Sequence, residues 1–171
     1  MRLRMGPLVG FFVFCGCATF AQGPAGNRAT GVVYEKSQNG SAASNSATVW
    51  IFNRDSSLDD TNGDGLYYIV IPSDVAQFEL RAKKKGFQTG QSERPYSNQK
   101  DPIKAGRITL EPEPPKSPNI RQIVDREIEV LSFKVPPKAR KLIVEDLRDL
   151  SKQTTAADAE YIKKRLAGLP Q

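Results

Sequence analysis

Residues 60–65 have the composition and spacing of a calcium-binding loop. Their sequence, Asp-Thr-Asn-Gly-Asp-Gly, places side-chain oxygens at alternating positions and ends in a glycine that lets the chain turn, an arrangement that suits a hard cation such as Ca²⁺. The twelfth position of such a loop should carry a bidentate Glu, but Ile71 occupies it. The segment is therefore predicted to be a hairpin turn, in which Asn, Asp and Gly supply the positive-φ geometry. The alternative is a weak Ca²⁺ site formed by Asp60, Asn62 and Asp64.

The same segment belongs to a cluster of acids in which paired carboxylates could perform acid–base catalysis, namely Asp55, Asp59, Asp60 and Asp64. We expect these side chains to be solvated, because they lie on a polar loop. The chain contains no histidine, which excludes a Ser-His-Asp triad, a Cys-His pair and His-ligated zinc or iron. The sequence therefore predicts a protein that is not an enzyme, with no catalytic, cofactor-binding or metal-binding residues assigned.

The first 21 residues have the pattern of a secretory signal peptide. Arg2 and Arg4 form a charged start, residues 7–14 are apolar, and small residues precede a cleavage point after Ala21. The apolar run is far shorter than the ~20 residues of a membrane-spanning helix. We therefore predict a signal peptide at 1–21, a spacer at 22–28 and an extracytoplasmic protein, either periplasmic or secreted.

The two cysteines of the chain, Cys15 and Cys17, lie within this leader. Cleavage after Ala21 would remove both and leave a mature protein without disulfides. In the alternative, Gly16-Cys17 ends a bacterial lipobox and Cys17 carries a lipid anchor. The protein would then be a membrane-anchored lipoprotein.

The excess of positive charge is modest and spread along the chain. There are 25 Lys and Arg residues against 19 Asp and Glu residues, a formal net charge of +6. Nucleic-acid binders usually concentrate basic residues on one face, whereas here the run is Lys83-Lys84-Lys85, which we interpret as a solvated strand end. We therefore expect no nucleic-acid partner.

The elements that would position these residues are mainly β. Alternating apolar residues predict short strands, bounded by turn residues, at 29–34, 47–52, 66–71, 77–83 and 107–110. In the second of these, Ala47, Val49 and Ile51 share one face, and the opposite face, which contains Trp50, is also apolar and should be partly covered. Short strands without intervening helices predict an antiparallel β-sandwich or barrel.

The order of these features resembles the carboxypeptidase regulatory-like domain. The matching segments are Gly31-Val32-Val33, Ala47-Thr48-Val49, residues 61–67, Ile71-Pro72, Phe78-Glu79-Leu80 and Gly86-Phe87. The resemblance covers about half of the chain, residues 29–111, and departs from the family at residues 74–77, where a Gly is usual. It implies a transthyretin-like (prealbumin-like) β-sandwich that acts as a structural or accessory module without catalytic residues. Some proteins with this fold are grouped with carbohydrate-binding folds.

The C-terminal part has helical periodicity. A proline-rich linker at 112–118 precedes a helical tail at 119–171, in which Ile120, Ile123, Val124 and Ile128 could line a short helix. A second helix opens at Pro136-Pro137 with an apolar stripe, and a third follows the cap Thr155-x-x-Asp158. The last two predict an α-helical hairpin whose start resembles a degenerate tetratricopeptide-type repeat. Its stripe either docks on the sandwich or binds a partner.

These features predict an exported, non-enzymatic accessory or protein-interaction module of the bacterial cell envelope. An exposed patch of Leu142, Ile143 and Leu147 would support an unidentified protein partner. The alternative is a carbohydrate-binding module that binds polysaccharide by stacking sugars on exposed aromatic rings of the sandwich. The candidate rings belong to Trp50, Tyr67, Tyr68, Phe87 and Tyr96.

Overall fold

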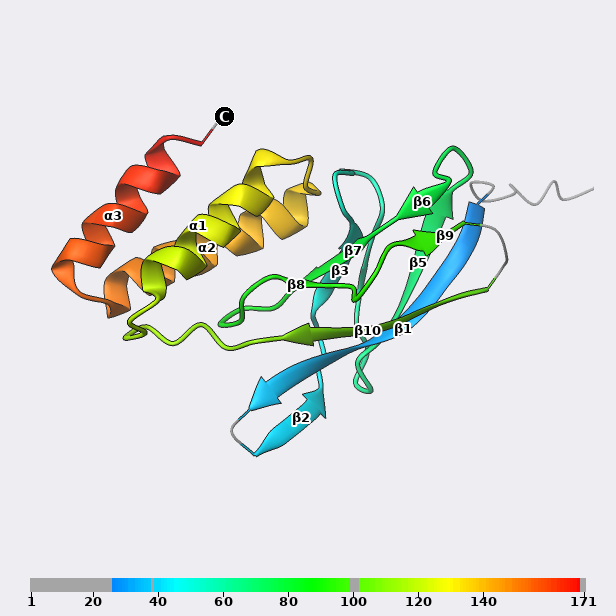
Figure 1. The fold of residues 1–171 in the computed structure, drawn as a ribbon, viewed down its shortest axis with the longest axis horizontal. Coiled ribbons are helices and arrows are strands. Elements are labelled where there is room, and N and C mark those ends of the chain that lie inside the picture. Colours follow the sequence, from blue (N-terminus) through cyan, green and yellow to red (C-terminus); the bar gives the residue numbers. More distant parts are fainter. Residues whose placement is uncertain (1–25, 38, 99–101, 170–171) are drawn as a thin grey trace, which may run out of the picture.

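The computed structural model describes residues 26–37, 39–98 and 102–169 (Figure 1). The predicted signal peptide, with Cys15 and Cys17, lies outside these residues. The strands are β1 (Gly26–Ser37), β2 (Gly40–Ala43), β3 (Thr48–Ile51), β4 (Leu58–Asp60), β5 (Leu66–Pro72), β6 (Gln77–Phe78), β7 (Leu80–Lys83), β8 (Gly90–Gln91), β9 (Tyr96–Ser97) and β10 (Ile103–Leu110). The helices are α1 (Ile120–Ser132), α2 (Pro137–Gln153) and α3 (Ala156–Ala167).

The strands form two facing sheets and a short two-stranded ladder. In sheet A, β1 lies between β10 on one side and β5 and β2 on the other. Sheet B has the order β4-β3-β7-β8, and β6 pairs with β9. The predicted fold class, a mainly β sandwich followed by a helical tail, is confirmed. One pairing differs from the all-antiparallel expectation, since β1 and β10 are parallel, which a long connection between two strands permits.

The inner faces of the two sheets form the core of the sandwich. Ala47, Val49 and Ile51 point inward as predicted, and they pack with Tyr67 and Ile69 of β5. The strand alternation places every second residue of β5 in this core. Gly31 of β1 lies where a Cβ atom would come within 2.3 Å of the Tyr67 hydroxyl, so the sheet can close there only over a glycine.

The turn at residues 62–65 links the two sheets. The Gly65 N–H donates to the Asn62 carbonyl at 3.0 Å, and Gly65 has a φ of +73°, in the region that favours glycine. The turn is therefore present, but the prediction of a hairpin is wrong. The strand before the turn, β4, pairs with β3, whereas the strand after it, β5, pairs with β1. A strand that switches sheets can leave a tight turn as readily as one that folds back on its neighbour.

The three helices form a cap with its own apolar core. Helix α1 spans the short helix expected from Ile120 to Ile128, and α2 begins at Pro137, which occupies the first helical turn as predicted. Thr155 caps α3, since its hydroxyl accepts the Asp158 N–H. The helix α3 contacts α1 and α2 and lies on the outer side of the cap (Figure 1). None of the helices in the described part of the chain is long and apolar enough to cross a membrane.

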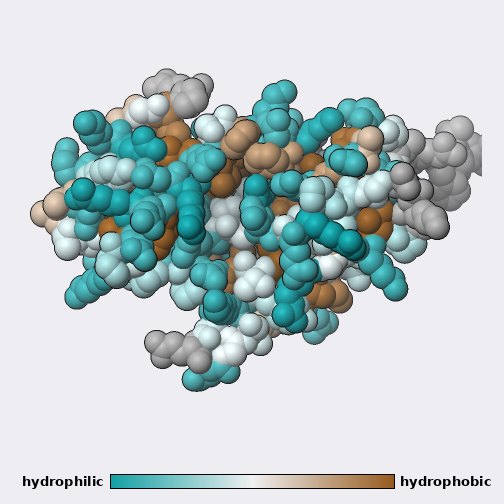
Figure 2. Space-filling model, viewed as in Figure 1, coloured by the Kyte–Doolittle hydropathy of each residue, from teal (hydrophilic) through white to brown (hydrophobic). Residues whose placement is uncertain are grey.

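The cap docks on the outer face of sheet B. Trp50, which is fully buried, points away from the sandwich core and joins the apolar core of the cap. The helix α2 contacts β3 and β7 (Figure 1). Of the two alternatives for the helical stripe, docking is therefore the one that the structure shows, and the expected cover over the second face of β3 is the cap. Hydrophilic side chains occupy most of the face seen in Figure 2, with apolar residues in small groups.

Candidate functional site

The junction between cap and sandwich contains a fully buried lysine. Lys83 is the last residue of β7, where Leu80 and Ala82 point into the sandwich core and Lys83 points outward under the cap. Its exposed fraction is 0%. The prediction that the run at 83–85 is a solvated strand end is therefore wrong for Lys83. The face of the sheet that carries Lys83 is the one that the cap covers.

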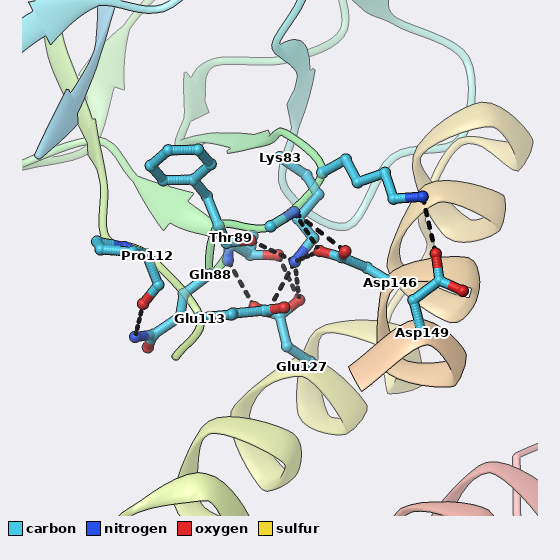
Figure 3. Close-up of polar contacts among 11 residues, drawn as sticks. Lys83, Gln88, Thr89, Pro112, Glu113, Glu127, Asp146 and Asp149 are labelled. Atoms are coloured by element: carbon cyan, nitrogen blue, oxygen red, sulfur yellow. Dashed lines mark hydrogen bonds and ion pairs between the residues drawn. The ribbon is translucent and has the colours of Figure 1, made fainter. Parts of the chain in front are cut away.

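Three carboxylates surround the Lys83 ammonium group (Figure 3). Its Nζ lies 2.8 Å from Glu113 Oε1, 2.9 Å from Asp146 Oδ2 and 3.6 Å from Glu127 Oε2. Glu113 belongs to the proline-rich linker, Glu127 to α1 and Asp146 to α2. The linker, α1 and α2 therefore each contribute one carboxylate to the same cation. We call Lys83, Glu113, Glu127 and Asp146 the junction cluster.

Groups of the loop after β7 hold two of these carboxylates. The Gly86 N–H donates to both carboxylate oxygens of Asp146, at 3.0 Å each. The Thr89 N–H and hydroxyl donate to Glu127 at 2.5 Å and 2.6 Å. The Lys83 ammonium group also donates to the Phe87 carbonyl. The loop is thus bound to the cap by charge-assisted hydrogen bonds, which are stronger than neutral ones.

Burial and mutual repulsion shift the protonation of the cluster. Burial raises the pKa of the Glu113 carboxyl to about 8, with help from the charges of Glu127 and Asp146 and against the attraction of Lys83. Burial alone would lower the pKa of Lys83, but the three carboxylates outweigh it and raise that pKa. At neutral pH the Glu113 carboxyl is therefore largely protonated.

This arrangement is suited to holding the helical cap on the sandwich. The charged amine is not a nucleophile, and it contacts three carboxylates and the Phe87 carbonyl. The ammonium group occupies the centre among the carboxylates, where a cation would bind. In the described part of the chain, no group of three or more His, Cys, Asp or Glu side chains could hold a metal ion. A pocket of about 120 Å³ borders Glu113 and Asp146, but the Lys83 amine itself has no exposed surface.

The side chains of the predicted calcium loop are engaged in local contacts. Asn62 Oδ1 accepts the N–H groups of Asp64 and Leu66. Asp60 accepts a hydrogen bond from Thr48 at 2.8 Å and pairs with Lys138 of α2. The segment therefore acts as a turn with an attachment to the cap. The hypothesis of a weak Ca²⁺ site stays a prediction.

The aromatic residues proposed as a sugar platform do not form an exposed row. Trp50 and Tyr67 are fully buried, and Tyr96 is 8% exposed. Phe87 is half-buried against the sandwich core, whereas Tyr68 is 60% exposed. The prediction of a platform built from these rings is wrong, because Tyr67 and Trp50 point into the two cores and Tyr96 is buried as well.

The apolar patch proposed on the tail is also buried. Ile143 and Leu147 have no exposed surface and belong to the core of the cap, and Leu142 is half-buried. The same stripe cannot hold the cap together and bind a partner. If the protein has a partner, the contact surface must lie elsewhere in the docked molecule.

The outer face of sheet A has no cover among the described residues. Tyr68 of β5, Thr30 of β1 and Lys104 of β10 form one cross-strand row. The neighbouring row of β5 and β1 consists of Val70, which is 39% exposed, and Arg28. On the next rows, Leu66, Val32 and Arg107 lie side by side, and the Arg107 guanidinium stacks over the Tyr34 ring at 4.3 Å.

Comparisons with known proteins give no family. No protein-family model matches the sequence, and no curated protein matches it. The β-sandwich implied by the resemblance is present in the structure, whereas no family model supports the carboxypeptidase regulatory-like or tetratricopeptide-type assignment.

Two solved structures are similar over part of the chain. Both are crystal structures of type II cohesin–X-dockerin complexes from Acetivibrio cellulolyticus, one an N-terminal and one a C-terminal interface mutant. The first is 14% identical, with a TM-score of 0.33, and the match covers 49% of this chain and 52% of that chain. The second is 17% identical, with a TM-score of 0.35, and the match covers 50% and 57%. The matches thus span about half the length of those chains, and similarity of this extent does not establish a shared function.

Proposed function

We propose that this protein is an exported, non-enzymatic interaction module that binds a short acidic segment of a protein partner through the outer face of sheet A. The observation that supports this proposal is the composition of that face. The outward residues of β5, β1 and β10 combine exposed apolar side chains with cations, and none of those described is a carboxylate. They are Leu66, Tyr68, Val70, Arg28, Thr30, Val32, Tyr34, Lys36, Lys104, Arg107 and Thr109, of which Lys36 pairs with Glu111 just after β10.

The charges of this face favour an acidic ligand. Lys104 is exposed and has no ion-pair partner among the residues that the structure describes. Arg107 is exposed, and its guanidinium stacks over the Tyr34 ring. The carboxylate nearest Tyr68, that of Asp59, accepts the backbone N–H of Tyr68 at the edge of β5. Complementary charge sets the orientation and the rate of such an association.

The size of the face favours a linear segment over a folded domain. Three strands about 4.8 Å apart and seven residues long cover about 330 Å². A stable interface between folded proteins needs about 800 Å² on each partner. The aliphatic side chains of Val70 and Leu66 favour a peptide, whose own apolar residues can pack on them, over a polysaccharide.

A direct binding measurement tests the proposal. A fluorescein-labelled peptide of alternating Glu and Leu is titrated with the protein, and its anisotropy is followed. We expect binding that weakens with salt and is lost in Tyr68→Ser and in Lys104→Glu. The matched control Lys163→Glu reverses an exposed charge on α3 and should bind as the wild type does. Equal affinity of all four proteins would refute the proposal, and preferential binding of polygalacturonate through the same residues would replace the peptide by a polysaccharide.

Export is a second part of the proposal. Its basis is the sequence of residues 1–21, and its test is the mass of the mature protein. Cleavage after Ala21 gives a chain that begins at Gln22. A diacylglyceryl mass on Cys17 would replace release by anchoring to the membrane, and an uncleaved chain would refute export by this signal.

A further inference from the structure

The junction cluster is the place where the cap and the sandwich recognise each other. Lys83 and the donors Gly86 and Thr89 come from the sandwich, and the carboxylates come from the linker, α1 and α2. Trp50 supplies the apolar part of the same junction. A change of charge in the cluster therefore acts directly on the contact between the two parts.

The cluster has more acids than bases. Three carboxylates lie within 3.6 Å of one ammonium group. The next cation, Lys85, lies in the solvent-exposed loop and pairs with Asp149 at 2.7 Å. Full ionisation would leave two uncompensated negative charges without solvent, which is costly. The docked structure therefore retains at least one proton in the cluster.

The geometry identifies the carboxyl that carries this proton. Hydrogen bonds donated to a carboxylate favour its ionised form. Glu127 accepts two such bonds from Thr89, and both oxygens of Asp146 accept the Gly86 N–H. The Glu113 carboxyl accepts a hydrogen bond from Lys83 but none from a backbone N–H of the residues that the structure describes. Glu113 is also the group whose pKa burial raises to about 8.

We propose that Glu113 is a proton-dependent latch, whose neutral form keeps the helical cap docked and whose ionised form releases it from sheet B. When Glu113 loses its proton, it faces Glu127 of α1 and Asp146 of α2, with the single charge of Lys83 between them. Because α3 packs on α1 and α2 and the helices share an apolar core, the cap moves as one unit. The release exposes Trp50 and the stripe of α2. This inference does not depend on the binding face of sheet A.

The emission of Trp50 reports on the latch. Trp50 is the only tryptophan of the chain, and it lies at the junction. As the pH is raised from about 6 to about 9.5, we expect its emission to shift to longer wavelength with a midpoint near pH 8, while the far-UV circular dichroism stays unchanged. The wild-type shift should reverse when the pH is lowered again. Trypsin should at the same time gain access to the linker at 112–118.

Two variants at neighbouring positions test the role of Glu113. Glu113→Gln keeps the shape of the side chain and cannot ionise, so its emission should not change over this pH range. Glu111→Gln removes an exposed carboxylate that pairs with Lys36, and it should behave as the wild type does. A constant wild-type emission, a shift that persists in Glu113→Gln, or a loss of circular dichroism together with the shift would each overturn the latch.

Discussion

Replacement of Lys83 by Met is the substitution with the largest expected effect on the free energy of unfolding. Met is about as long as Lys and is apolar, so the change removes the charge and keeps the volume of the side chain nearly the same. The side chain of Lys83 is fully buried and bonds Glu113 and Asp146 at 2.8 Å and 2.9 Å. Removal of one partner of a buried ion pair costs about 3–5 kcal/mol.

The structure predicts how this cost depends on pH. In Lys83→Met, the cluster retains its carboxyls without a cation, and it must bind more protons than the wild-type cluster to limit its negative charge. For each additional proton bound by the folded state, the free energy of unfolding falls by about 1.4 kcal/mol for every unit by which the pH rises. We therefore expect Lys83→Met to lower the free energy of unfolding by about 3 kcal/mol at pH 6, the lower end of the range for a buried ion pair, and by more at pH 8.

Urea denaturation followed by Trp50 emission and by circular dichroism measures this loss. A second variant combines Lys83→Met with Glu113→Gln, Glu127→Gln and Asp146→Asn, so that no charge remains in the cluster. Because uncharged replacements of buried ion pairs are often neutral or stabilising, this variant should recover most of the lost stability. A loss of stability below about 1 kcal/mol in Lys83→Met, or no recovery in the uncharged variant, would refute the role of Lys83 as the buried cation that pairs with these carboxylates.

Three further predictions concern single features. The pKa of Glu113 is higher in the folded protein than in the unfolded chain, so its contribution to stability is complete below about pH 4.5 and is lost as the pH rises to about 8; urea denaturation should show this slope in the wild type and not in Glu113→Gln. Gly31→Ala should destabilise the sandwich by more than about 1 kcal/mol, because its Cβ would lie 2.3 Å from the Tyr67 hydroxyl. Thr155→Ala should lower the melting temperature and cost about 1 kcal/mol, because the Asp158 N–H loses its cap acceptor.

Local patterns predicted the parts of the fold that depend on nearest neighbours. The alternation in 66–71 identified β5, and the helical spacing of Ile120, Ile123 and Val124 identified α1. Such patterns do not indicate which strands, distant in the sequence, pair with one another. The parallel alignment of β1 with β10 and the change of sheet after the turn at 62–65 depend on how the whole chain closes.

The junction cluster was missed because its members are ordinary residues when each is considered alone. Lys83 lies in a basic run, Glu113 in a proline-rich linker, and Glu127 and Asp146 on helices with exposed charges nearby. A signal was nevertheless present in the strands. The alternation along β7 places Lys83 on the outer face of sheet B. The apolar Trp50 lies on that same face and required a cover.

A lysine beneath such a cover requires buried acids, since a lone buried ammonium group would lose its charge or prevent docking. The acids can come only from whatever forms the cover. A covered lysine at the end of β7 therefore predicts carboxylates on the buried faces of the helices, where an apolar stripe alone would predict none. Glu127 and Asp146, buried on the inner faces of α1 and α2, meet this requirement, and the third acid, Glu113, makes the contact depend on a proton.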